Sequence, residues 1–364
     1  ATSEMECLLE ILSMPTVDVT KKSKEGKTLL LDILSNEALH TSSHMKDVVI
    51  PIVQKILELG GSLSVQDEQG VTPLMAYARI MEATISEMEC LLELLSMPTV
   101  DIHLKSHDDK KSTVLFDIIM NESLHSSPHI KEMMIPIVTK IVTECGGNMT
   151  TDKNDKGWTP IMVYSVTMEP TIASMECFIE LLDLPTVDIR YNYEHHNLNS
   201  ILMHSIISQG YLRSSPNVKD IIVPIVKKMI DIGGNISEVG DVFLCSPLME
   251  YAYTMEPTIP HMECLLGLLE LPTVDMTVKD SKSDSQCTLL HYLLSNRRLW
   301  LSPNVKDIII PIVKKVIEKG GSLSAVNARG NTPLMGIVHK IVINQVNMEC
   351  LSHLLMLPTV DIML

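Results

Sequence analysis

The sequence predicts an all-α protein in which helix–turn–helix units stack into one curved solenoid. Three short motifs predict this fold, because each of them recurs along the chain with the same period of 83 to 87 residues. They are Met-Glu-Cys, Pro-Thr-Val-Asp and Thr-Pro-Leu-Met, the last with small variations. Self-similarity at a fixed period is the signature of repeat architectures. The copies of Met-Glu-Cys begin at Met5, Met88, Met175, Met262 and Met348.

Each period divides into two units, and the unit that opens with Thr-Pro-Leu-Met is called type A here. Thr72 is a good N-cap, because its hydroxyl can accept a free backbone N–H, and proline is tolerated at the position that follows. A short helix over about 74–81 is predicted. The next helix is expected to start near Ser86, whose spacing to Glu89 makes a capping box. Pro98 then ends that helix, since proline cannot continue it.

The other unit, type B, carries a polar insert between a short helix and a longer one. The short helix is predicted to begin at Thr28, Thr113, Ser200 or Thr288 in the four copies. The longer helix is expected to end at a Gly-Gly pair such as 60–61, where glycine supplies a left-handed cap. Pro51 lies inside that helix or at its start, and we expect an added turn followed by a kink.

These units resemble ankyrin repeats. Residues 72–78, Thr-Pro-Leu-Met-Ala-Tyr-Ala, are similar to the Thr-Pro-Leu-His-x-Ala motif of that family, and Gly70 falls where the family places the glycine that opens a repeat. The resemblance covers essentially the whole chain and implies units of a β-turn and two helices. Methionine stands at the family's histidine position, and packing by this flexible side chain is expected to replace the histidine's hydrogen bonds. These methionines are Met75, Met162, Met249 and Met335.

We expect a single ankyrin-like solenoid over residues 1–364, with about nine units. Their approximate ranges are 1–24, 25–69, 70–109, 110–156, 157–196, 197–240, 241–283, 284–329 and 330–364. The first unit lacks its opening helix, and the last one ends in the apolar residues Ile362, Met363 and Leu364. Terminal repeats of a solenoid need a polar outer face. We therefore expect the chain to be part of a longer one.

Composition excludes several classes of function. The chain has 29 Lys and Arg against 45 Asp and Glu, which gives a net charge of −16. Such an acidic chain without a basic tract is a poor partner for nucleic acid. No apolar run approaches the roughly 20 residues that span a bilayer, so we expect no membrane insertion. The apolar share of 45% is too high for a disordered chain.

The cysteines favour an intracellular protein. Five of the eight occupy one repeat position, where their spacing along a stack is too long for disulfides, and we expect buried free thiols there. They are Cys7, Cys90, Cys177, Cys264 and Cys350. Free thiols are typical of a reducing compartment. Since no signal peptide begins the sequence, a cytoplasmic location is predicted.

Residues with possible chemistry are few. His40 and His44 bracket one insert, and His125 and His129 bracket the next, a spacing that could place two imidazoles on one metal. Later inserts lack this pattern, so surface loops without a metal are the favoured interpretation, and the metal alternative stays open. The aspartate of each Pro-Thr-Val-Asp motif is expected to form turn hydrogen bonds. No nucleophile, phosphate-binding or zinc motif is present, and we expect neither an enzyme nor a cofactor.

The remaining candidates for function are residues on the predicted surface. In ankyrin repeats, partners usually dock on the side formed by the turn tips and the first helices, so tip residues that vary between matching units are candidates for binding a protein. Neutral drift of exposed loops would produce the same variation. The candidates are Arg190, Tyr191, Tyr193, His103, Lys105, Lys21, Lys22, Lys279 and Trp158.

Two functions are compatible with such a surface. The favoured one is a protein–protein interaction scaffold or adaptor that presents its turn tips and concave face, with a weak preference for a basic or mixed-charge partner. The alternative is a structural array, a spacer, spring or filament component, which stacks end to end with further repeats through its apolar ends. Either function implies a protein partner or self-association, and the sequence does not identify the partner.

Overall fold

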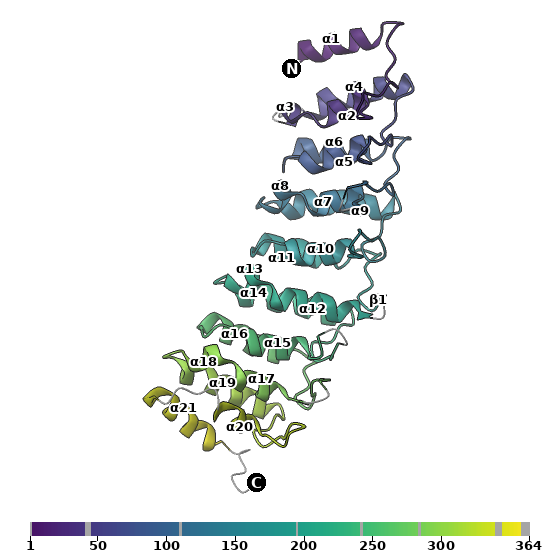
Figure 1. Cartoon of the computed structure of the whole chain (residues 1–364). Helices are drawn as coiled ribbons and strands as arrows, with labels where there is room; N and C mark the ends of the chain where they lie inside the picture. The colour runs from purple at the N-terminus through teal and green to yellow at the C-terminus, as the bar shows by residue number, and fades with distance from the viewer. Residues whose placement is uncertain are drawn as a thin grey trace. The chain divides into compact units, whose positions relative to one another are not determined.

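The computed structural model describes residues 2–40, 45–108, 111–193, 196–240, 243–282, 285–338 and 344–357, and most of them are helical. The all-α repeat fold is confirmed (Figure 1). The chain forms two compact units, and each of them is described by itself. Unit 1 comprises Ala1–Glu169 and Glu176–Val187, and unit 2 comprises Pro170–Met175 and Asp188–Leu364. The single solenoid with nine ranges stays a prediction.

In unit 1 the helices form two rows. The first-helix row consists of α2 (Leu29–Leu34), α5 (Pro73–Ile80), α7 (Val114–Ile119) and α10 (Pro160–Thr167). The second-helix row consists of α1 (Thr2–Leu12), α4 (Met45–Glu58), α6 (Ile85–Leu94) and α9 (Ile130–Thr143). Two short helices, α3 (Glu37–His40) and α8 (Glu122–His125), lie in the sequence between a first and a second helix, and α11 (Ile172–Leu181) is divided between the two units.

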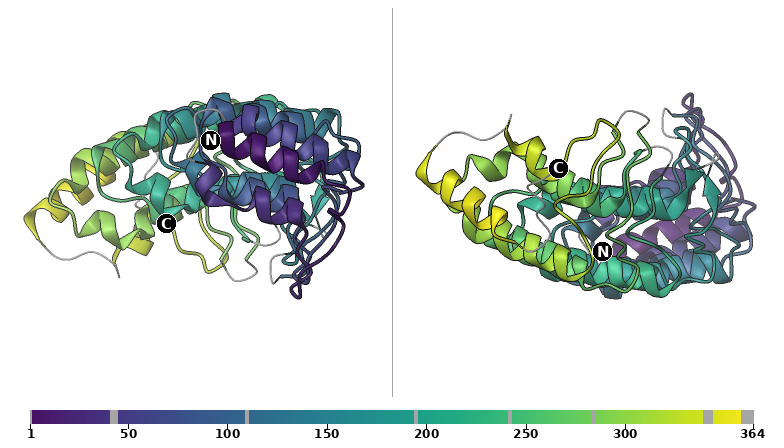
Figure 2. Two further views of the ribbon diagram at one scale, coloured as in Figure 1. Left: turned by 90° about the horizontal axis from the view of Figure 1, so that it is seen from above. Right: turned by 90° about the horizontal axis from the view of Figure 1, so that it is seen from below.

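Unit 2 repeats this arrangement. Its first-helix row consists of α12 (Leu198–Ser208), α15 (Pro247–Thr254), α17 (Leu289–Ser295) and α20 (Pro333–Val338). Its second-helix row consists of α14 (Val218–Asp231), α16 (Ile259–Leu269), α19 (Val305–Glu318) and α21 (Gln345–Leu355). The short helices are α13 (Gly210–Ser214) and α18 (Arg297–Trp300), and β1 (Asn192–Tyr193) pairs antiparallel with β2 (His196–Asn197). Figure 2 shows the two rows and the loops that extend beside the first helices.

The predicted caps are partly confirmed. The Thr72 hydroxyl accepts the Met75 N–H at 3.1 Å, as the Thr-Pro motif predicts. The capping box at Ser86 is wrong, because Thr84 caps α6 by accepting the Glu87 N–H. The Ser86 hydroxyl instead accepts the Lys46 N–H of the neighbouring long helix. The predicted start at Ser200 is also wrong, since α12 begins two residues earlier, at Leu198.

Proline and glycine occupy the places that their backbone chemistry favours. Each 14-residue helix of the type B units contains its proline at the seventh position, as at Pro51 in α4. Gly60 follows that helix with a φ of +92°, so the left-handed cap is confirmed. A second left-handed position lies two residues before the N-cap of a first helix. Glycine takes it at Gly70 (φ +74°), whereas Leu244 and Gln286 take it at +56° and +46°, which costs a residue with a Cβ about 1–2 kcal/mol.

A repeated tyrosine–cysteine pair explains the predicted thiol position. Tyr77, Tyr164 and Tyr251 are fully buried on first helices and hydrogen-bond to Cys90, Cys177 and Cys264 on the following second helices. These thiols and Cys350 are buried and free, as expected, but Cys7 is exposed. The prediction for Cys7 is wrong because no helix with such a tyrosine packs on α1 among the described residues.

The methionines at the family's histidine position pack as expected in three copies. Met75, Met162 and Met249 are buried, whereas the side chain of Met335 is 44% exposed. Histidine does stand at this position in one type B copy, at His291. Its Nδ1 lies 2.9 Å from the Thr288 hydroxyl, and its Nε2 lies 3.0 Å from the Asn331 carbonyl oxygen of the next loop. The methionine copies therefore replace a hydrogen bond between units with apolar packing.

The surface-loop prediction holds for most of two inserts, because residues 126–129 and 301–304 form largely exposed turns, but the first residue of each of these inserts ends a short helix and is buried. His125 is buried, with Nε2 2.7 Å from the carbonyl oxygen of Ile119. Trp300 is buried at the matching place, and its Nε1 donates to the Leu294 carbonyl oxygen at 2.8 Å. Each ring thus satisfies a carbonyl at the end of a first helix. His129 is exposed, and the side chains of His40 and His44 lie outside the described residues.

Two buried asparagines tie type B units to the type A units before them. The side-chain amide of Asn121 donates to the carbonyl oxygens of Ala78 and Met81, at 2.9 and 3.1 Å. In unit 2, Asn296 donates to those of Ala252 and Met255 in the same way. The last turns of α5 and α15 are therefore held by the next unit along the chain.

Candidate functional site

The tip lysines form a structural ladder between neighbouring loops. Lys22, Lys105 and Lys279 occupy one repeat position, four residues after the aspartate of Pro-Thr-Val-Asp. Their Nζ atoms donate to carbonyl oxygens of the next loop along the chain, those of Gln66, Lys153 and Val326, at 2.9, 2.7 and 3.0 Å. All three side chains are nevertheless exposed. They remain candidates for partner binding that already have a structural contact.

The other candidates lie on the same loops. Lys21, His103, Arg190 and Trp158 are exposed, the last at 41%. Tyr191 is half-buried beside Arg190, while Tyr193 belongs to β1 and its side chain lies outside the described residues. The structure thus places them on several separate loops rather than in one cluster.

The recurrent aspartates form turns, as predicted. Asp18, Asp101, Asp188 and Asp275 each accept the N–H of the residue two positions later, at 2.8–3.0 Å. Hydrogen bonds from Thr20 and Thr277 lower the pKa of Asp18 and Asp275. Asp361 lies outside the described residues. These carboxylates are therefore engaged locally rather than arranged as a catalytic set.

The strongest variation between like units occurs on the first-helix row. The residue four positions after Thr28, Thr113, Ser200 or Thr288 on the type B first helices is Asp32, Asp117, His204 or Tyr292. The residues two positions before it and two positions after it are apolar and buried in all four copies. They are Leu30, Leu115, Leu202 and Leu290 before it, and Leu34, Ile119, Ile206 and Leu294 after it. The same repeat position on the first helices therefore carries side chains of different chemical type. The sequence already carries this variation, which appears when the four type B copies are aligned at this position.

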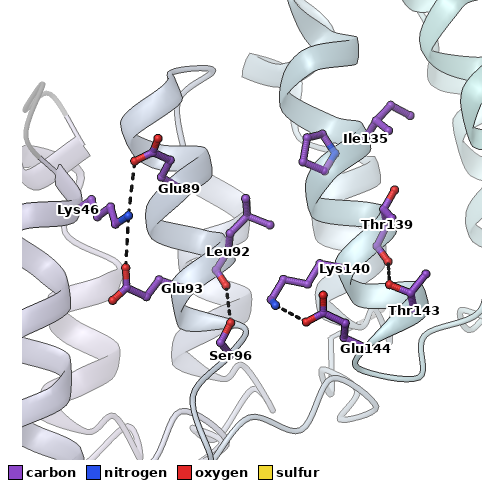
Figure 3. Close-up of a pocket in the computed structure, with 11 residues that line it drawn as sticks. Lys46, Glu89, Leu92, Glu93, Ser96, Ile135, Thr139, Lys140, Thr143 and Glu144 are labelled. Carbon is purple, nitrogen blue, oxygen red and sulfur yellow. Dashed lines mark hydrogen bonds and ion pairs between the residues drawn. The ribbon is translucent and has the colours of Figure 1, made fainter.

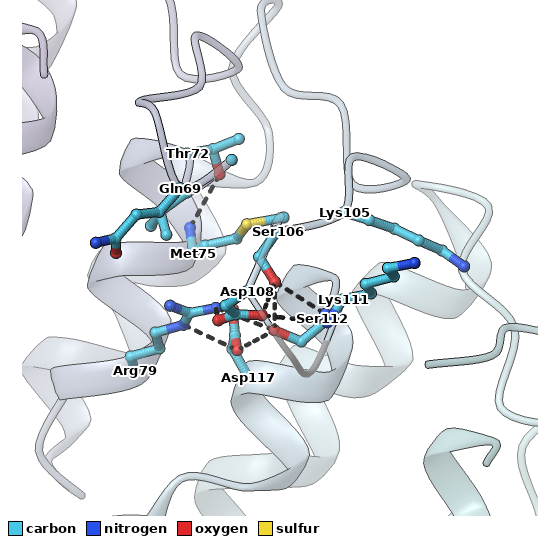
Figure 4. A network of polar contacts seen from close by, with 12 residues as sticks. Gln69, Thr72, Met75, Arg79, Lys105, Ser106, Asp108, Lys111, Ser112 and Asp117 are labelled. Atoms are coloured by element: carbon cyan, nitrogen blue, oxygen red, sulfur yellow. Dashed lines mark hydrogen bonds and ion pairs between the residues drawn. The ribbon is translucent and has the colours of Figure 1, made fainter. Parts of the chain in front are cut away.

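In unit 1 this position carries a charged cluster (Figure 4). Arg79, in the last turn of α5, points its Nε at Asp117 Oδ1 on α7, 3.0 Å away. Its Nη2 lies 3.3 Å from Asp108 Oδ2 and 3.0 Å from the Ser112 hydroxyl, both on the loop before α7. The Ser112 hydroxyl donates to Asp117 Oδ1 at 2.9 Å. Two first helices and one loop therefore build the cluster.

Asp117 is unusual because it is ionisable and almost completely buried, with 4% of the residue exposed. Burial raises the pKa of Asp117 to about 6, although Arg79 and Ser112 lower it. Its Oδ2 atom has no hydrogen-bond partner in the described part of the chain. A buried acceptor without a partner costs free energy, so the cluster is not optimised for stability alone.

In unit 2 the same place carries an aromatic cluster. Tyr253 stands at the repeat position of Arg79, and its ring is nearly perpendicular to the Tyr292 ring, with centroids 6.0 Å apart. The Tyr292 hydroxyl donates to buried Asp280 at 2.8 Å, and Lys282 Nζ lies 5.6 Å above the Tyr292 ring. With Glu250 and other neighbours, these residues line a pocket of about 340 Å³.

The third type B copy presents a stacked pair of rings instead. His204 lies parallel to Phe243, with ring centroids 3.9 Å apart. Its Nδ1 lies 2.7 Å from the Ser200 carbonyl oxygen, and burial lowers the pKa of His204. A neutral, buried imidazole results, which adds a third chemistry to the same row.

A groove on the second-helix row is a weaker candidate (Figure 3). It has a volume of about 690 Å³ and lies along α6 and α9. Lys46 Nζ lies 3.5 Å from Glu89 and 3.4 Å from Glu93, and Lys140 pairs with Glu144. Such exposed ion pairs usually contribute little to stability. Because both lysines already have carboxylate partners, the charges of this groove are largely satisfied within the chain.

The buried cysteine thiols are not set up as nucleophiles. Burial raises the pKa of Cys90, Cys177, Cys264 and Cys350 to about 12, so these thiols stay protonated at neutral pH and are poor nucleophiles. Within the described ranges, no group of three or more His, Cys, Asp or Glu is placed to hold a metal ion. No helix in that part of the chain is long and apolar enough to cross a membrane.

Paired helices, projecting loops and Thr-Pro caps define an ankyrin-repeat-like fold. Among solved structures, the chain is similar to the ankyrin repeat domain of Bcl-3, which is described as a unique member of the IkappaB protein family. The TM-score is 0.50 at 15% sequence identity, and the match covers 78% of this chain and 100% of that one. No protein-family model and no curated protein matches the sequence.

Proposed function

We propose that the chain is a protein-recognition module that binds its partner with the first-helix row and the loops beside it. The observation that carries this proposal is the variation at one position of a constant frame. Asp117, His204 and Tyr292 differ completely in chemistry, while the residues two positions before and two positions after each of them are apolar and buried. Stacked repeats commonly provide extended binding surfaces of this kind, and tyrosine and arginine are favoured anchors at interfaces.

The partner is a protein with basic or mixed charge. The net charge of −16 favours such a partner through long-range attraction. The tip residues Arg190, Tyr191 and Tyr193, with Trp158 and His103, extend the proposed surface onto the loops. A scaffold or adaptor role in a reducing, intracellular compartment fits the eight free cysteines. Since the buried thiols are protonated, the proposal includes no catalytic step.

A peptide-display selection on the whole chain tests this function. Selected peptides should lose at least tenfold in affinity when Arg79 or Tyr253 on the first-helix row is replaced by alanine. The matched controls are Lys227→Ala and Lys314→Ala, which change exposed residues on the second-helix row and should leave the affinity within twofold. Failure to select any peptide, or equal losses in both sets, would show that the first-helix row is not the binding surface.

Replacement of Arg190, Tyr191 and Tyr193 by alanine tests the loop part of the surface separately. Reduced affinity for the selected peptides would support a contribution of these tips. An unchanged affinity would restrict the proposed surface to the helices.

An end-to-end array is the second candidate function, and an apolar-lined pocket at the first helices and an exposed methionine after α21 favour it. Met5, Leu8, Ile33 and Val48 help to line a pocket of about 400 Å³ beside α1, and Met356 after α21 is 87% exposed. Mass photometry over a range of concentrations separates the two candidates. Concentration-dependent chains of copies would support the array, whereas a monomer at all concentrations would contradict it.

A further inference from the structure

A pocket of about 310 Å³ opens beside Asp117, where the end of α5 meets the start of α8. The acidic residues Asp108, Asp117 and Glu122 are among those that line it, as are the apolar Met81 and Met120. The guanidinium of Arg79 is the basic group of the lining. Three carboxylates against one guanidinium give the pocket a negative charge at neutral pH.

The hydrogen bonds within the cluster of Arg79, Asp108, Ser112 and Asp117 do not use one acceptor, Asp117 Oδ2. Arg79 directs Nε to Asp117 Oδ1 and Nη2 to Asp108 and Ser112. Oδ1 of Asp117 also accepts from Ser112, so two donors share that one oxygen. Oδ2 is buried and has no partner among the described residues. Buried polar atoms are almost always hydrogen-bonded in folded proteins, so this oxygen suggests a donor that arrives from outside the chain.

We propose that this pocket binds the ammonium group of a lysine side chain on a protein partner, with Asp117 Oδ2 as its acceptor. The inference deepens the proposed function and rests on it. Lysine fits better than arginine, because an ammonium group binds as a point charge, whereas the guanidinium fork prefers two acceptors in one plane. The apolar lining suits the four-carbon stem of lysine, which packs on apolar surface while its charge reaches a polar group.

The residues around Asp117 Oδ2 allow an ammonium group to reach it. Oδ2 is shielded from water, so an incoming ammonium group must displace part of the lining. Met81 and Met120 belong to that lining, and unbranched methionine side chains rearrange readily. Burial also holds the pKa of Asp117 near 6. A cation beside the carboxylate lowers that pKa, which couples lysine binding to deprotonation of Asp117.

Peptides selected on the whole chain provide the main test. Changing the anchoring lysine of a selected peptide to norleucine, which keeps the stem and removes the charge, should weaken binding to the wild type at least tenfold. The same change should alter binding to the Asp117→Asn variant less than twofold. Asp155→Asn removes an exposed loop carboxylate and should behave as the wild type does.

The outcomes separate this inference from the proposed function. If no peptide binds the wild type, both fail. If peptides bind without a lysine dependence, or with the same dependence in Asp117→Asn, the inference fails and the proposed function stands.

A second measurement uses only the wild-type protein, so it does not depend on whether a variant folds. n-Butylammonium chloride imitates the lysine side chain, and carbon-detected NMR follows the titration of the Asp117 carboxyl group in the wild type. At 50 mM n-butylammonium the titration should move to lower pH by at least half a unit relative to 50 mM sodium chloride. An identical titration in both salts would overturn the proposal.

Discussion

Replacing Asp117 with asparagine keeps the shape of a buried side chain and removes its charge. The asparagine carbonyl can still accept from Arg79 and from the Ser112 hydroxyl, so the contacts of Oδ1 are retained in kind. Burial raises the pKa of Asp117 from 3.8 to about 6 in the folded state. The folded protein therefore prefers the neutral side chain, and asparagine supplies one at every pH.

The sign and size of the effect follow from the raised pKa. A group with a higher pKa in the folded state contributes stability that is complete below its unfolded value, near pH 4, and is lost as the pH rises through about 6. A shift of two units corresponds to about 3 kcal/mol. We expect Asp117→Asn to match the wild type near pH 4 and to be more stable by up to about 3 kcal/mol at pH 8. The melting temperature would then rise by about 4 °C if the whole chain unfolds together.

Thermal melting followed by circular dichroism at pH 4, 5, 6, 7 and 8 measures this difference. Asp155→Asn is the matched control, since it removes an exposed carboxylate and should leave the melting temperature nearly unchanged at each pH. If the melting temperature of Asp117→Asn fell below that of the wild type as the pH rises, the reasoning would be refuted. That result would mean that the ion pair with Arg79 outweighs burial and that Asp117 is charged at all these pH values.

Three further predictions concern the frame of the repeats. Gln286→Gly should raise the free energy of unfolding by about 0.5–1 kcal/mol in urea titrations, because glycine relieves a left-handed backbone at an exposed side chain; a loss of stability would contradict this. Asn296→Ala should lower that free energy by about 2–3 kcal/mol, because two buried carbonyls lose their donor; a change below 0.5 kcal/mol would show that water replaces the amide. In native protein at pH 8, iodoacetamide should label exposed Cys7 and spare buried Cys90, as mass spectrometry of peptides can establish; equal labelling would indicate frequent local opening.

The sequence was sufficient to predict the local elements that depend on backbone chemistry. The Thr-Pro cap at Thr72 and the left-handed glycine at Gly60 were predicted correctly, because they depend on neighbouring residues alone. The cap of the next helix was predicted wrongly. Ser86 and Thr84 both precede a suitable N–H donor, and the stacking of α4 against α6 directs the Ser86 hydroxyl to Lys46 instead.

Contacts between units could not be predicted in this way. The burial of His125 and Trp300 depends on carbonyls at the end of the preceding helix, which the polar sequence around these rings does not reveal. The tip lysine Lys105 was assigned to partner binding from its exposure alone, and its contact with the carbonyl oxygen of Lys153 depends on the spacing of stacked loops. The cluster of Arg79 and Asp117 was missed for the same reason, since its members come from two helices and a loop.

The binding role of the first-helix row is tested most directly by hydrogen–deuterium exchange of the whole chain with and without a selected peptide. We predict slower exchange in the last turn of α5 and in the loop before α7, around Arg79 and Ser112, or around Tyr253 in unit 2. Protection confined to the long helices of the second-helix row, such as α9 or α19, would contradict the assignment of the binding surface.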